Sequence, residues 1–222
     1  DSSVVSIGEK THKVLTCRHI TKQNDPVSQR HEKLGTEEIY DFLSDRDVNV
    51  NIHCHDRNMS VNKFIRDRGE ITNQNDMWHA IKAVGKAITN ISTGPRYKHG
   101  STWHEELADK VKPITSHLYH SIKNCDQDCS KLRTSIMNST KHYQNDHSDC
   151  SSSSRCKRDP NYEPSHMILN SKTAVSLLKG VLENCVIYKH PEDFNMGRET
   201  FYVESFNNVM NKIGRASCRE RV

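Results

Sequence analysis

One short run of alternating residues constrains the fold of this chain more than any other feature. From Val48 to His55, apolar side chains alternate with Asn and His, and Asp56 follows the last of them. A period of two with one apolar face is typical of a half-buried β-strand, so the intervening polar side chains, His53 and His55 included, are expected to face solvent. From Met77 onward the period changes to that of a helix. A strand followed by helical segments indicates a domain of the mixed α/β class.

A β-hairpin is predicted before this strand, and helices on both sides of it. The β-rich runs 3–7 and 13–20 flank a turn that contains Gly8. Thr36 is expected to cap the first helix, because acidic residues and then apolar residues at helical spacing follow it. The segment 146–164, rich in Ser, Cys and Pro, is expected to be a loop. The helices predicted from apolar periodicity cover residues 36–43, 60–68, 77–92, 107–122, 131–143, 173–185 and 199–211.

Composition and the two ends of the chain exclude some classes of protein. The net charge of +4 is too small for a chain that stays disordered through charge repulsion. No window approaches 18 consecutive apolar residues and no signal peptide is recognisable, so we expect no membrane span and an intracellular protein. Setting aside Cys218 in the tail leaves an odd seven of the eight cysteines, which favours reduced thiols over a disulfide framework.

The ends also suggest a piece of a longer protein. Asp1 opens directly on a strand-like pattern. Residues 213–222, which read IGRASCRERV, show no apolar periodicity and resemble the translation of a sequencing adapter. These ten residues are therefore excluded from the expected domain. They hold three arginines and one glutamate, so the net charge falls from +4 to +2 without them, and basicity favours no partner.

Three acidic residues stand where a catalytic metal site would form. Asp56 follows the predicted strand, at the edge where α/β folds place ligand groups. Asp76 precedes the helix that starts at Met77, with His79 three residues later, and Glu204 lies among aromatic residues of the last predicted helix. Mg²⁺ takes oxygen ligands, and two such ions assist phosphodiester cleavage. Most acids in a chain are simply solvated, and Asp76 would also serve as the N-cap of its helix.

The order of these residues resembles the catalytic block of cut-and-paste DNA transposases of the DDE type. In the run HCHDRNMSVNKFIRDRGEITNQNDMWHAIKAVGKAI, Asp56 matches the second catalytic acid of those enzymes. Asp76 and His79 match their Asp-x-x-His signature. The later run ETFYVESFNNVMN resembles the helix that carries their third acid, which Glu204 matches. The residues between resemble the helical insertion that some of these families place before that Glu.

The resemblance implies an RNase H-like α/β domain that lacks its first strand and carries a mostly α-helical insertion. The first catalytic Asp of the family lies on that missing strand. Asp56 and Glu204 are then expected to bind Mg²⁺ or Mn²⁺, while Asp76 and His79 belong to the catalytic site as orienting groups. The implied divisions are residues 1–92 and 196–212 for the truncated catalytic core, 93–195 for the insertion and 213–222 for the adapter-derived tail.

The implied function is metal-dependent cleavage and transfer of DNA strands in the nucleus. The partners are transposon ends and target DNA, and a homo-oligomer is compatible with this activity. With one acid missing, the chain by itself is expected to be inactive. The alternative is a decayed or domesticated transposase remnant that binds nucleic acid or protein without catalysis. An Asp on the upstream strand is required by the enzyme hypothesis and is irrelevant to the other.

A second group of candidate ligands lies within 15 residues, spaced His142-x4-His147-x2-Cys150-x5-Cys156. Zn²⁺ takes four nitrogen or sulfur ligands tetrahedrally and would pin the Ser-rich loop in which most of them lie. His166 is an alternative ligand if His142 points away along its helix. The spacing differs from the common Cys-x2-Cys finger, and a polar loop with incidental His and Cys explains the same residues equally well.

Overall fold

The computed structural model describes residues 2–219, except for the side chains of residue 211 and residues 213–219. The chain divides into two compact units. One, here called the sheet unit, consists of Asp1–Asn75 and Glu199–Val222. The other, the helical unit, consists of Asp76–Arg198. The mixed α/β class predicted from the sequence is confirmed, with helix far exceeding strand.

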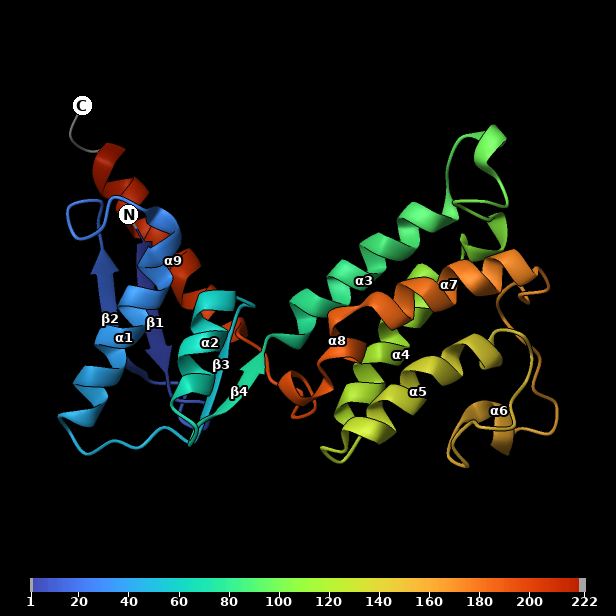
Figure 1. Cartoon of the computed structure of the whole chain (residues 1–222), viewed down its shortest axis with the longest axis horizontal. Helices are drawn as coiled ribbons and strands as arrows, with labels where there is room; N and C mark the ends of the chain where they lie inside the picture. The colour runs from blue at the N-terminus through green and yellow to red at the C-terminus, as the bar shows by residue number, and fades with distance from the viewer. Residues whose placement is uncertain (1, 220–222) are drawn as a thin grey trace. The chain divides into compact units, whose positions relative to one another are not determined.

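The sheet unit contains two separate two-stranded sheets (Figure 1). Strands β1 (Ser2–Ile7) and β2 (Val14–Ile20) form the predicted antiparallel hairpin. Strands β3 (Ile52–His55) and β4 (Thr72–Asn75) pair in parallel, with helix α2 (Met59–Asp67) as the crossover between them. Parallel neighbours require such a crossover, so β3, α2 and β4 form a βαβ unit.

The strand before Asp56 is shorter than the alternation predicts and has a different neighbour. Residues Val48 and Val50 lie outside β3. Asp47 adopts a positive φ of 54°, and the N–H of Val48 donates to the carbonyl of Leu43 at 3.0 Å, so Val48 closes the turn that ends the preceding helix. Among the described strands, β3 pairs with β4 and not with the hairpin, whereas the RNase H-like fold implied by the resemblance predicts residues 48–54 as a central strand beside the hairpin.

Helix α1 (His31–Ser44) packs on the hairpin and begins earlier than predicted. Thr36 is not its cap: it is buried inside the helix, where its hydroxyl donates to the carbonyl of Glu32 at 2.8 Å. The helix lies close to β1 at Gly35, where a Cβ atom would come within 2.6 Å of Val4 Cγ2. A side chain at this position would push the helix away from the sheet, so glycine is required here.

The helical unit has one apolar core, built by the stripes that the sequence predicts. Its long helices are α3 (Met77–Ser92), α4 (Val111–Lys123), α5 (Cys129–His142) and α7 (Lys172–Asn184), with short helices α6 (Arg155–Arg158) and α8 (Val186–Lys189). Pro113 lies in the first turn of α4, where a missing N–H costs nothing, and α4 continues past it. The core side chains include Met77, Ile81, Val84, Ile88, Leu107, Ile114, Leu118, Leu132, Ile136, Leu178 and Leu182.

Helix α3 belongs to the helical unit, although the resemblance places residues 77–92 in the catalytic core. The reason is its apolar face, which packs into the same core as α4 and α7.

At the other end of the chain, α9 (Phe201–Arg219) runs beyond the expected end at residue 211. It therefore includes residues of the adapter-like tail that was excluded from the expected domain, and the last residues of that tail, 220–222, lie outside the described part of the chain.

Candidate functional site

Asp56 and Glu204 come together in the sheet unit, although 148 positions separate them in the chain. Asp56 directly follows β3 and is exposed, and Glu204 lies in the first turn of α9. One carboxylate oxygen of each lies within 4.8 Å of the other. Thr200 links the two: its hydroxyl donates to Asp56 Oδ1 at 3.1 Å, and its carbonyl accepts from the N–H of Glu204 at 3.0 Å.

The strand that ends at Asp56 rests on a buried polar network, and the expectation that its histidines face solvent is wrong. His53 Nδ1 lies 3.1 Å from the Tyr40 hydroxyl of α1. His55 Nε2 lies 3.1 Å from the side-chain oxygens of both Asn62, on α2, and Asn73, on β4. Burial, and secondly the nearby His55, lower the pKa of His53 to about 3. His53 is therefore neutral at physiological pH.

Asp76 and His79 come together in the helical unit, at the start of α3. Asp76 is the N-cap: its Oδ1 accepts from the N–H of His79 at 2.8 Å. The same oxygen lies 3.3 Å from Nδ1 of the His79 ring. The Asp76 side chain is 2% exposed and that of His79 is 43% exposed. The capping role considered for Asp76 is therefore present, while a part in orienting catalytic groups stays a prediction.

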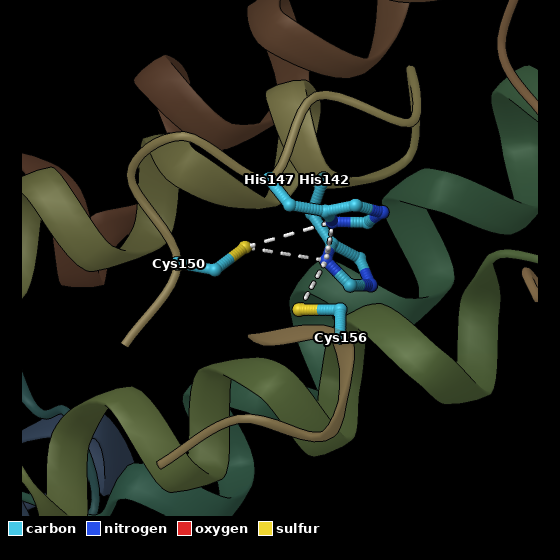
Figure 2. Close-up of side chains that lie close together, drawn as sticks. All are labelled: His142, His147, Cys150 and Cys156. Atoms are coloured by element: carbon cyan, nitrogen blue, oxygen red, sulfur yellow. Dashed lines mark hydrogen bonds between the residues drawn. The ribbon is translucent and has the colours of Figure 1, made fainter. Parts of the chain in front are cut away.

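The four residues of the second group converge at the end of α5, as Figure 2 shows. His142 is the last residue of α5, and its Nδ1 lies 3.2 Å from His147 Nδ1. Cys150 Sγ lies 3.5 Å from His142 Nδ1 and 3.8 Å from His147 Nδ1. Cys156 Sγ, on α6, lies 3.9 Å from His142 Nδ1. All four donor atoms lie within 4.8 Å of one another, and each residue is partly buried.

Protonation in this cluster follows from burial. Burial, with a smaller contribution from the neighbouring His147, lowers the pKa of His142, so its ring is neutral and offers a lone pair. Burial also raises the pKa of the Cys150 thiol, and contact with Cys156 adds to that rise. His166, the alternative ligand, lies instead with its Nδ1 3.6 Å from Asp109 Oδ2. His142 points into the cluster, so no substitute ligand is needed.

Comparison with known proteins shows the family of the chain. Residues 6–156 match the family model of the Mutator-like transposases. The chain belongs to this family. Because the Mutator-like transposases are a family of DDE transposases, the resemblance drawn from the sequence is confirmed. No curated protein and no solved structure matches the chain.

The family match covers most but not all of the candidate residues of this Mutator-like transposase. Asp56, Asp76 and His79 lie inside the matched range, and so does the whole His and Cys cluster up to Cys156. Glu204 lies outside it. Among the residues that the structure describes, no helix combines the length and the apolar character that crossing a membrane requires.

Sequence reasoning missed two parts of the candidate site in this family member. Thr200 was not singled out, although its position four residues before Glu204, at the start of a predicted helix, is a recognisable signal. The buried network of Tyr40, His53, Asn62 and Asn73 was also missed, because polar residues are ordinarily read as exposed.

Proposed function

We propose that Asp56 and Glu204 are two of the metal-binding acids of a transposase that cleaves and rejoins DNA strands by metal-assisted phosphoryl transfer. The observation that carries this proposal is the distance of at most 4.8 Å between their carboxylate oxygens. Oxygen ligands lie about 2.0–2.1 Å from Mg²⁺, so two ligands of one ion are up to roughly 4.2 Å apart. A small rotation of either side chain suffices to bring the pair to that distance.

The donor set fits Mg²⁺ or Mn²⁺, because both prefer carboxylate oxygens to nitrogen and sulfur. When bound, such ions activate the attacking hydroxyl or water and stabilise the leaving oxygen of the phosphodiester. The exposure of Asp56 leaves room for DNA and for water at the same point. Family membership supports DNA, as transposon ends and target, as the substrate, with the nucleus as the place of reaction.

Other residues of the sheet unit position the two acids. The Thr200 hydroxyl, which donates to Asp56 Oδ1, orients one of the two carboxylates. The contacts of His53 with Tyr40 and of His55 with Asn62 tie the end of β3 to α1 and α2. Ligands held by side chains that are themselves fixed keep their geometry, which favours metal binding without reorganisation.

The finer fold that we propose is an RNase H-like domain without its first strand. Two features of the sheet unit support it: an antiparallel hairpin and a parallel βαβ unit occur in the same compact unit. Parallel strands are found almost only in larger, covered sheets, and two strands alone are marginal. A further strand that joins the two small sheets would remove this anomaly.

Metal binding tests the acid pair directly in the chain as it is. We expect Mn²⁺ affinity, measured by titration calorimetry, to fall at least about tenfold in Asp56→Asn and in Glu204→Gln. Glu70→Gln, an exposed acid of the same unit, is the matched control and should bind as the wild type does. Equal Mn²⁺ affinity in all four proteins would reject the site.

Strand-transfer assays then separate the enzyme from a non-catalytic remnant. In a longer protein that includes the upstream strand, the enzyme hypothesis expects strand transfer that either acid substitution abolishes. DNA binding without strand transfer, together with intact Mn²⁺ binding, would favour the remnant.

A further inference from the structure

The segment between α5 and α7 is long and has almost no apolar packing of its own. Among residues 144–170, all of which the structure describes, only Leu169 is buried. Its N–H donates to the carbonyl of Tyr143 at 2.7 Å. Ordering such a segment costs conformational entropy, and burial of one leucine does not offset that cost over so many residues. Another interaction must hold the segment in place.

The far half of the segment is fastened by two carboxylates. Asp109 Oδ2 accepts from the N–H of Met167 at 2.7 Å. Glu106 Oε2 accepts from the N–H groups of Asn170 and Ser171 at 2.9 and 3.0 Å. Nearer to α5, the segment is held outside the His and Cys cluster at Asp149, whose carbonyl accepts from Asn138 Nδ2 at 3.1 Å and whose carboxylate forms an exposed ion pair with Lys141. An exposed ion pair contributes little, so the cluster is the main candidate for holding residues 144–165.

We infer that His142, His147, Cys150 and Cys156 bind one structural zinc ion that fastens the near half of this segment to α5. Bond lengths of about 2.0–2.1 Å to nitrogen and 2.3 Å to sulfur give tetrahedron edges of about 3.4 Å for N–N, 3.5 Å for N–S and 3.8 Å for S–S pairs. The observed N–N distance is 3.2 Å, and the two distances from His142 and His147 to Cys150 Sγ and the distance from His142 to Cys156 Sγ are 3.5, 3.8 and 3.9 Å. Four of the six donor–donor distances therefore agree with a zinc tetrahedron to about 0.4 Å, and the other two are at most 4.8 Å.

The groups around the cluster select the ligand atoms that zinc needs. His147 Nε2 lies 3.0 Å from Asn145 Oδ1, so the proton sits on Nε2 and the lone pair of Nδ1 faces the cluster. Asn138 Nδ2 donates to Cys150 Sγ at 3.7 Å and to the carbonyl of Asp149 at 3.1 Å. A donor aimed at sulfur favours the thiolate that binds metal.

The backbone turn after α5 explains how two histidines five positions apart meet. Asn145 adopts a φ of +64°, a left-handed conformation that Asn tolerates better than most residues. Its N–H donates to the carbonyl of His142 at 3.1 Å, which closes the turn. The chain then doubles back, and His147 faces the last residue of the helix.

Zinc is the ion that this donor set favours, and its role is structural. Two imidazoles and two thiols in a tetrahedron suit Zn²⁺, whereas Mg²⁺ and Mn²⁺ prefer oxygen. Four protein ligands leave no coordination position for water or substrate, so the site is closed. The ion would join α5 to α6 and leave chemistry to other residues.

Metal analysis of the full chain, purified under reducing conditions, tests the inference. We expect about one zinc ion per chain. Replacing zinc by Co²⁺ should give the intense visible bands of a tetrahedral site and the near-ultraviolet charge transfer of thiolate ligands. Cys150→Ser and His147→Asn should retain zinc at least about tenfold less well against a competing chelator.

Matched substitutions outside the cluster control this experiment. Cys129→Ser changes a thiol at the other end of α5, and His166→Asn changes a histidine of the same segment that pairs with Asp109. Both should retain zinc as the wild type does. If a ligand variant fails to fold, the cobalt spectrum of the wild type still shows whether thiolates bind the metal in a tetrahedral site.

Three results would overturn the inference. The first is a chain that takes up neither zinc nor cobalt. The second is a disulfide between Cys150 and Cys156 under reducing conditions, since both are free thiols in the structure. The third is equal loss of zinc in the ligand and control variants. None of these results bears on the acid pair of Asp56 and Glu204, which lies in the other unit.

Discussion

The acid pair of the sheet unit and the His and Cys cluster of the helical unit are built in opposite ways. Asp56 and Glu204 offer oxygen donors from the end of a strand and the start of a helix, 148 positions apart. The cluster offers nitrogen and sulfur donors from one stretch of 15 residues, most of it irregular. In the first, a folded scaffold positions the ligands. In the second, the ligands position the chain.

This difference teaches what each metal would contribute. Where secondary structure already holds the ligands, removal of the ion abolishes metal-dependent activity but leaves the fold intact. Where the ligands lie in a segment with only one buried leucine, removal of the ion leaves that segment disordered. The two sites should therefore differ in metal preference and also in what fails when the metal is withdrawn.

The largest expected effect is release of residues 144–165, the near half of the segment after α5, on removal of zinc. Structural zinc contributes apparent binding free energies of about 10–16 kcal/mol in small zinc-binding peptides near neutral pH. Treatment with a zinc chelator should raise the rate of tryptic cleavage after Arg155, Lys157 and Arg158 by at least about tenfold. Readdition of Zn²⁺ should restore protection, and Mn²⁺ should not. Unchanged cleavage would mean that the segment is held without metal.

The next effect is a pH dependence that His53 gives to the sheet unit. The folded pKa of His53, about 3, lies below its ordinary value of 6.5. The unfolded chain therefore binds more protons between these two values. The stabilisation by the neutral ring is complete above pH 6.5 and is lost as the pH falls from 6.5 toward 3, by up to about 1.4 kcal/mol per pH unit.

Urea unfolding at pH 7 and pH 4.5 measures this dependence. His53→Gln keeps a polar group opposite Tyr40 but does not titrate, so its loss of stability over this interval should be smaller than that of the wild type. His19→Gln, an exposed histidine of the hairpin, is the control and should lose as much as the wild type. Equal losses in all three proteins would contradict the burial argument for His53.

The part of this molecule that sequence predicts best is the part with apolar periodicity. Helices α2, α3, α5 and α7 lie within two or three residues of their expected positions, because their buried stripes recur at helical spacing. Strand β4 reads Thr-Asn-Gln-Asn and buries three of these residues, so it carries no apolar signal. Its buried side chains rely on partners such as Asn62, which no pattern of neighbouring residues indicates.

The alternation at Val48–His55 correctly predicts a strand but not which of its faces is covered. Two helices pack over the His face, where Tyr40 and Asn62 supply polar partners, and this choice depends on tertiary structure. The four ligands of the cluster are visible in the sequence. Their convergence depends on the left-handed turn at Asn145, which spacing alone does not reveal.

A smaller effect is expected when the contact between Thr200 and Asp56 is removed, and it tests whether the scaffold positions the acid pair. Thr200→Val removes the hydroxyl that donates to Asp56 Oδ1 and keeps the shape of the side chain. We expect Mn²⁺ affinity to fall about tenfold, because groups that orient a ligand contribute on this scale. Zinc content should not change. Thr89→Val, a helical Thr of the other unit, is the control. An effect on both metals would show that the substitution disturbs the fold and not one site.

The smallest effects concern Asp76 and His79, which separate a capping role from a catalytic one. Asp76→Ala removes the acceptor of the His79 N–H and should destabilise the chain by about 1 kcal/mol, whereas Asp76→Asn retains a capping oxygen and should stay near the wild type. Thermal unfolding measures both. His79→Ala keeps the backbone N–H that is capped, so its stability should also be close to that of the wild type.

The stability-neutral variants are then the ones that test function. In a longer protein that includes the upstream strand, Asp76→Asn and His79→Ala should both reduce strand transfer if the Asp-x-x-His signature orients catalytic groups. Since neither substitution removes the cap, loss of activity could not be ascribed to a frayed α3. Strand transfer at the wild-type rate in both variants would leave the cap as the whole role of Asp76. The signature would then count as a structural feature of helix α3 and not as part of the catalytic machinery.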